Sequence, residues 1–142
     1  PFSDRYPEHP NLRCAVREDE ALHPLGRFLD GFAAVRSGSA DRLAIAIIAG
    51  VPPDLIADDS LESYERILAD PRMGFAVDPD EPTSPRTSCD VPGRGVAFPP
   101  RRLVRVAQAL SPLSTVQSIC QADLRPATAA LIQLIGSRDC LD

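Results

Sequence analysis

Residues 43–51, LAIAIIAGV, form an unbroken apolar run that includes three isoleucines. A run of this kind, without polar alternation, is typical of a β-strand buried on both faces, as in a parallel sheet covered by helices. It is also far too short to cross a lipid bilayer, so no membrane insertion is expected. The fold class that follows is α/β.

Helical periodicity surrounds this strand. Apolar residues at three- and four-residue steps predict a helix over residues 22–35. A short helix is expected over residues 61–68, with Asp59 or Ser60 as its N-cap. A third helix is expected to begin at Pro100, because proline suits the first helical position.

A second strand, residues 114–119, and a last helix from about Asp123 complete the predicted order. The helical residues expected to be buried are Leu61, Tyr64, Ile67, Leu68, Leu103, Val104, Ala107, Leu110, Leu124, Ala127, Leu131, Leu134 and Ile135.

Two strands joined through a helix form a right-handed parallel crossover unit. A sheet of only two parallel strands leaves apolar strand edges without partners. We therefore expect a partial doubly wound, Rossmann-like sheet, with the remaining strands upstream of Pro1. The chain starts at Pro1 rather than at methionine, which predicts processing or a longer parent protein. Residues 1–142 are interpreted as a single partial domain.

Two segments are predicted to lack regular structure. Residues 1–20 are polar and hold three prolines, so they are interpreted as an irregular lead-in. From Pro71 to Pro100 the chain carries seven prolines and three glycines. We therefore expect residues 71–99 to form a long loop inside the domain, and a loop of this length is functional or held in place.

Net charge argues against two classes of partner. Fifteen basic residues, all arginine, stand against 20 acidic ones, which gives a net charge of -5. Phosphate backbones and anionic lipid surfaces repel such a chain, so neither nucleic acid nor a membrane surface is an expected partner.

Four cysteines, Cys14, Cys89, Cys120 and Cys140, show no C-x-x-C spacing, which argues against a compact zinc site. In the predicted topology Cys89 and Cys120 both lie at the upper edge of the sheet. We therefore predict a Cys89–Cys120 disulfide, with Cys14 and Cys140 bonded outside this chain or free. A structural disulfide indicates a compartment outside the cytosol, either secreted or in the cell envelope.

A catalytic role for Cys120 is the alternative, because it stands where a strand meets a helix. A thiol enzyme needs a base, and the only histidines are His9 and His23. His9 is in the irregular lead-in and His23 in the first turn of a helix. No catalytic residue is therefore predicted, and the protein is not expected to be an enzyme.

Arginines gather around the predicted helix start at Pro100: Arg94, Arg101, Arg102 and Arg105. Cations at a helix N-terminus oppose the helix dipole, so they need an anion or carboxylate partners. An acidic ligand is one interpretation. Pairing with Asp80, Glu81 or Asp90 is the one we favour.

Five segments together resemble a known family: NLRC, IAGVP, ILADPRM, CDVPGRGVAFPPRRLVRVA and VQSICQADLRPA. From about Asn11 to Cys140 the chain looks like the C-terminal half of von Willebrand factor A-like (VWA) domains of the secreted type found in myxobacteria and related bacteria. The resemblance implies a doubly wound α/β fold and a metal-ion-dependent adhesion site built on an Asp-x-Ser-x-Ser motif. Residues 58–63, DDSLES, have the wrong spacing for that motif, so no metal ligand is assigned in this chain.

The expected function is therefore that of the C-terminal portion of an extracellular VWA-like binding or adhesion domain. No cofactor is expected in this chain, and Mg²⁺ or Ca²⁺ would belong to the full-length domain. The partner would be a protein or another extracellular ligand. The alternatives are a structural module of a cell-envelope assembly without a metal site and, less favoured, a cysteine-dependent enzyme.

Overall fold

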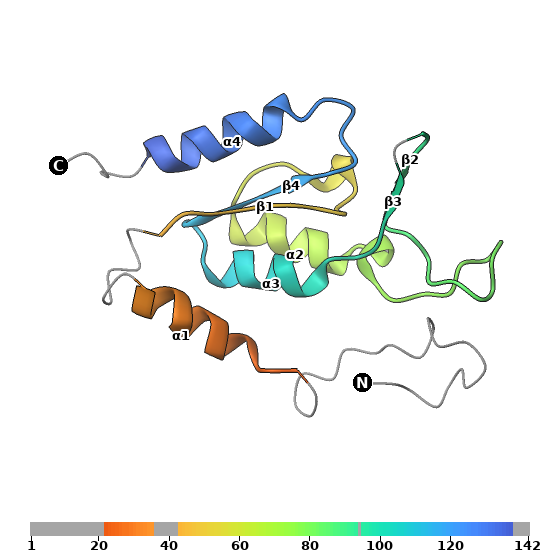
Figure 1. The fold of residues 1–142 in the computed structure, drawn as a ribbon, viewed down its shortest axis with the longest axis horizontal. Coiled ribbons are helices and arrows are strands. Elements are labelled where there is room, and N and C mark those ends of the chain that lie inside the picture. Colours follow the sequence, from red (N-terminus) through yellow and green to blue (C-terminus); the bar gives the residue numbers. More distant parts are fainter. Residues whose placement is uncertain (1–21, 36–42, 94, 138–142) are drawn as a thin grey trace.

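A computed structural model describes residues 22–35, 43–93 and 95–137. Its elements are, in order, α1 (Leu25–Val35), β1 (Ile45–Ala49), the 3-10 turn η3 (Pro53–Leu55), α2 (Leu61–Ala69), the 3-10 turn η4 (Pro71–Met73), β2 (Cys89–Val91), β3 (Gly95–Ala97), α3 (Arg101–Ala109), β4 (Ser114–Ser118) and α4 (Arg125–Gly136). Figure 1 shows α1, α2 and α3 on one face of the β1–β4 sheet and α4 on the other. The α/β fold class predicted from the sequence is confirmed.

The central sheet is the parallel pair β1 and β4, in which Ile45 lies opposite Ser114 and Ala49 opposite Ser118. The Ile45 N–H donates to the Leu113 carbonyl at one end (2.9 Å), and the Ile119 N–H donates to the Ala49 carbonyl at the other (2.9 Å). Odd-numbered residues of β1 therefore direct their backbone groups toward β4. Because backbone direction alternates along a strand, even-numbered residues direct theirs to the outer edge.

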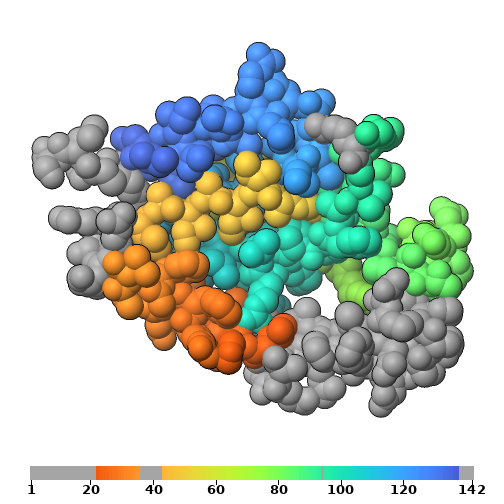
Figure 2. All heavy atoms as spheres, in the orientation of Figure 1, coloured from red at the N-terminus to blue at the C-terminus, as the bar shows by residue number. Residues whose placement is uncertain are grey.

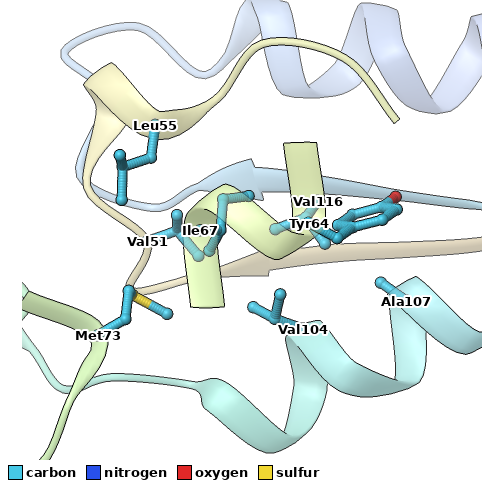
Figure 3. Packing of buried hydrophobic residues seen from close by; sticks show 8 residues of the cluster. All are labelled: Val51, Leu55, Tyr64, Ile67, Met73, Val104, Ala107 and Val116. Carbon is cyan, nitrogen blue, oxygen red and sulfur yellow. The ribbon is translucent and has the colours of Figure 1, made fainter. Parts of the chain in front are cut away.

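The hydrophobic core lies between one face of this sheet and helices α2 and α3, as Figure 3 shows. Its buried members are Val51, Leu55, Tyr64, Ile67, Met73, Val104, Ala107 and Val116. The ring of Tyr64 is buried with them, and its hydroxyl donates to the Ser114 carbonyl (3.0 Å). Burial raises the pKa of Tyr64 to about 12, so the phenol keeps its proton and acts as a donor.

The helices begin close to where the sequence predicts. Ser60 caps α2, because its hydroxyl accepts the Ser63 N–H (3.1 Å), and Asp59 does not take this role. Pro100 is the residue before the first helical residue of α3 rather than that residue itself. None of the described helices is long and apolar enough to span a membrane.

Burial differs from the prediction in two respects. Strand β1 was expected to be buried on both faces, but Ala46 and Ile48 are exposed, the latter at 48 %. Helix α4 packs mainly against β4, and the described residues leave Ala46 and Ile48 of β1 uncovered. Four helical residues that were expected to be buried are also exposed: Leu61, Leu103, Leu124 and Ile135.

The proline-rich segment contains a β-hairpin that the sequence analysis did not predict. Strands β2 and β3 pair antiparallel, with Cys89 opposite Ala97 and Val91 opposite Gly95. Gly93 has a φ of 76° and Gly95 a φ of 136°, values that residues with a Cβ rarely adopt. The expected lead-in, residues 1–20, lies outside the described residues.

Replacing Tyr64 by phenylalanine should lower the free energy of unfolding by about 1–3 kcal/mol, because the buried Ser114 carbonyl loses the phenol that donates to it. Urea denaturation measures the change. Leu61→Ala, at an exposed position of the same helix, is the control and should stay within about 0.5 kcal/mol. An equal loss in both variants would mean that the hydrogen bond does not stabilise the fold.

Candidate functional site at the carboxyl edge of the sheet

The carboxyl ends of β1 and β4 meet in a network of hydroxyl and backbone contacts. The Ser118 hydroxyl donates to the Val51 carbonyl, and the Cys120 N–H donates back to that hydroxyl oxygen (3.0 Å). Ser118 is fully buried. The two chain segments that leave the sheet are therefore held together directly beyond their last paired residues.

The hairpin docks on the same edge through Ser88 and Gly50. The buried Ser88 hydroxyl donates to the Gly50 carbonyl (2.5 Å), and the Ser88 N–H donates to the Ala97 carbonyl (2.8 Å). A Cβ on Gly50 would lie 2.5 Å from the Ala97 Cβ and 2.9 Å from the Phe98 carbonyl oxygen. Only glycine at position 50 lets the base of the hairpin approach this closely.

A disulfide closes the arrangement by joining Cys89 at the start of β2 to Cys120 after β4, with a Cα–Cα distance of 6.3 Å. The pairing is the one predicted from the topology. Cys120 therefore has no free thiol with which to act as a nucleophile. Cys14, Cys140 and His9 lie outside the described residues, and His23 lies next to the Arg27 guanidinium on α1 (2.9 Å).

An open apolar groove of about 210 Å³ lies beside the disulfide, between the hairpin and the start of α4. Its lining consists of Val91, Gly95, Val96, Ala97, Ile119, Cys120 and Leu124. Three of these side chains are strongly exposed: Val96 at 56 %, Ile119 at 49 % and Leu124 at 42 %. Among the described residues the lining contains no acid, base or free thiol, so the lining that is described suits contact with an apolar surface rather than proton transfer.

Three of the four predicted cluster residues, Arg101, Arg102 and Arg105, are among the described residues. Arg101 donates to the carbonyl of Leu68 in the last turn of α2 (2.7 Å) and to that of Met73 in the 3-10 turn that follows (3.1 Å). Arg102 donates to the His23 carbonyl and lies over the Phe28 ring, 5.6 Å from its centroid. Arg105 lies on α3, half-buried, and Arg94 lies outside the described residues.

Residues 58–63 have a structural role. The Asp58 carboxylate accepts the Ser60 N–H (3.0 Å) and the Ser63 hydroxyl (2.5 Å) at the start of α2. These hydrogen bonds lower the pKa of Asp58 to about 2, so the group stays ionised near the positive end of the helix. Within the described residues no group of three or more His, Cys, Asp or Glu side chains could hold a metal ion.

Sequence reasoning found the disulfide and missed the rest of this edge. Ser88, Ser118 and Gly50 each look like ordinary loop or strand-end residues in the sequence. The available signal was position: Ser88 directly precedes Cys89, Ser118 closes the second apolar strand, and Gly50 follows the first one.

Comparisons with known proteins found no match: no protein-family model fits the chain, and no curated protein or solved structure is detectably similar. The VWA-like resemblance therefore stays a prediction.

Substituting serine for both Cys89 and Cys120 should lower the free energy of unfolding by about 3–4 kcal/mol, the loop-closure contribution for cysteines 31 residues apart. Denaturation with and without a reducing agent measures this. The reductant should weaken the wild-type protein to the level of the double variant and leave that variant unchanged. Wild-type stability that is indifferent to the reductant would contradict the stabilising role of the bond.

Gly50→Ala should destabilise the protein by about 1–3 kcal/mol, because the new methyl group overlaps the base of the hairpin. Gly26→Ala on α1 is a matched control, since nothing lies within 4 Å of its Cβ position. Alanine there should be neutral or stabilise the helix by up to about 1 kcal/mol. Thermal unfolding followed by circular dichroism compares the two variants, and equal midpoints would contradict the close packing.

Proposed function

We propose that this chain is part of a non-catalytic extracellular binding domain of the VWA-like type, and that the groove at the carboxyl edge of its sheet contacts a protein partner. The observation that carries the proposal is the exposure of Val96, Ile119 and Leu124 around the Cys89–Cys120 disulfide.

Position and rigidity both support a binding role for this groove. In open α/β sheets, ligands bind beyond the carboxyl ends of the strands. Adjacent exposed apolar side chains are typical of interaction sites on soluble proteins. The disulfide and the Ser88 hydrogen bond hold the hairpin before any partner arrives, so association costs less conformational entropy.

The Cys89–Cys120 disulfide also supports a location outside the cytosol. Structural disulfides persist in oxidising surroundings and are rare in the cytosol of mesophilic organisms. A secreted or cell-envelope location follows, as the sequence predicts. The same proposal includes a larger doubly wound sheet, of which β1 and β4 are two strands, and any metal-ion-dependent adhesion site lies outside this chain.

The structural module of a cell-envelope assembly is the second candidate, and the exposed apolar groove suits it too, because such a surface also packs against fixed neighbours. A cysteine-dependent enzyme has less support. Cys120 is in a disulfide, and the groove is lined by apolar side chains and that bond.

Ile119→Asp and Val96→Asp test the proposal by adding a charge to the groove at exposed positions. The wild-type protein, immobilised, should capture proteins from the secreted and envelope fractions of the producing organism. Each variant should bind them at least about tenfold more weakly, because a buried unpaired carboxylate costs more than 1.4 kcal/mol.

Leu61→Asp is the matched control, since Leu61 is equally exposed on α2, away from the groove, and it should bind like the wild type. Circular dichroism and a non-reduced peptide map verify that each variant folds and keeps its disulfide. Unchanged capture by both groove variants would refute the proposed surface. Capture only of components of one envelope assembly would favour the structural module.

A further inference from the structure

The outer edge of β1 is an open strand edge. Within residues 22–35, 43–93 and 95–137, β1 pairs with β4 alone. The backbone groups of Ala46 and Ile48 point away from β4, and both side chains are exposed. Figure 2 shows β1 at the molecular surface between α4 and α1. The unpaired backbone groups along the edge of an apolar strand are a site at which a further strand can pair.

An apolar groove lies next to this edge on the face that carries α1 and α3. It has a volume of about 410 Å³ and is lined by Leu25, Phe28, Phe32, Ile45, Ile47, Arg102, Leu103 and Val106. Helix α1 forms one wall, although none of its own residues is buried. The side chains of a strand beside β1 would point into this groove, because side chains on one face of neighbouring strands lie next to each other.

The opposite face of the sheet offers a second apolar wall. Ala127 and Leu134 of α4 are buried, and Ala130 and Gln133 line a hollow together with residues 56–59. Helical geometry puts Leu124, Leu131 and Ile135 on the flank of α4 that points away from this hollow. Leu124 and Ile135 are exposed there and Leu131 is half-buried, so this flank is apolar without being fully covered.

We propose that the outer edge of β1 receives one β-strand with apolar side chains on both faces, and that this strand precedes α1 in the same polypeptide. The backbone edge selects an extended segment. The α1–α3 groove and the flank of α4 select apolar side chains on its two faces. A strand buried on both faces is the form that parallel sheets use.

Helix α1 identifies the source of the strand. Figure 1 shows that α1 runs opposite to β1 and lies on the same face as α2 and α3. A crossover from a strand beside β1, through α1, to β1 would move across the sheet in the same direction as the crossover from β1 to β4. Because α1 lies on the same face of the sheet as α2 and α3, this crossover would also have the same handedness as the crossover from β1 to β4, as the rule for parallel crossovers requires. A second copy of this chain fits less well, because it would bring its own α1 and α3 into the same space.

This inference rests on one part of the proposed function, the larger sheet, and specifies where its next strand lies. It does not depend on partner binding at the carboxyl-edge groove, although Leu124 lines that groove as well as the flank of α4. The test uses the intact polypeptide that contains these residues, labelled with ¹⁵N, and follows amide exchange along β1. Ala46 and Ile48 should exchange about as slowly as Ile47, whose N–H points toward β4. Exposed amides would exchange about 100-fold or more faster, and that result would overturn the proposal.

Cross-strand nuclear Overhauser effects then identify the partner segment. Contacts from Ala46 and Ile48 should lead to a segment before α1, in the pattern of parallel strands. Contacts to a segment that follows α4, or intermolecular contacts in a mixture of labelled and unlabelled protein, would overturn the proposed source.

A pair of lysine variants gives an independent readout on the same intact protein. Ile48→Lys would bury a charge beneath the added strand, whereas Leu61→Lys changes a comparably exposed residue on α2. We expect the melting temperature of Ile48→Lys to fall by about 5 °C or more below that of Leu61→Lys. Equal melting temperatures would mean that Ile48 is not covered, and would overturn the proposal.

Discussion

The parallel pairing of β1 with β4 is the constraint on which the rest of this structure depends. Between Ile45 and its partner Ser114 the chain has to fit α2, the hairpin and α3. Helices α2 and α3 pack against one face of the pair, where Tyr64 joins α2 directly to the Ser114 carbonyl. The strand pair thus forms only together with that helical layer, because its contacts are distant in sequence and each costs loop-closure entropy.

Side chains satisfy backbone carbonyls at several places where these elements end. Ser118 and Ser88 donate to the turn after β1, at Val51 and Gly50, and Arg101 donates to a carbonyl in the last turn of α2. A buried carbonyl without a donor costs free energy comparable to a lost hydrogen bond. Arg101, which its position in the sequence made a candidate for anion binding, thus has a structural role in satisfying two backbone carbonyls.

The sequence predicted those features whose signal lies within the segment itself, and missed those that depend on contacts from elsewhere in the chain. Strands β1 and β4 and all the helices carry periodic or continuous apolar patterns, so their existence and order were predictable. The Cys89–Cys120 bond followed from that order. The hairpin was missed because strands of three residues among prolines and glycines carry no periodic pattern. Its position depends on Gly50 and Ser88, which contact it from outside its own sequence.

Ile48 shows a different limit of sequence-based prediction. The apolar run correctly predicted a strand, but it did not predict that Ile48 would be exposed. A run of isoleucines predicts burial on both faces, and the described residues cover one face of β1 only. At the carboxyl end of the same strand, Gly50 and Val51 are fully enclosed by the hairpin and Ser118. Strand β1 thus has a closed carboxyl end, where side chains and the disulfide hold the backbone beside an apolar groove. Its outer edge is open among the described residues, and its exposed apolar side chains and backbone groups suit a further strand. The closed end suits recognition of a partner surface, since its geometry is held by covalent and hydrogen bonds. The open side suits assembly of a sheet, since backbone pairing accepts any extended segment with matching apolar faces.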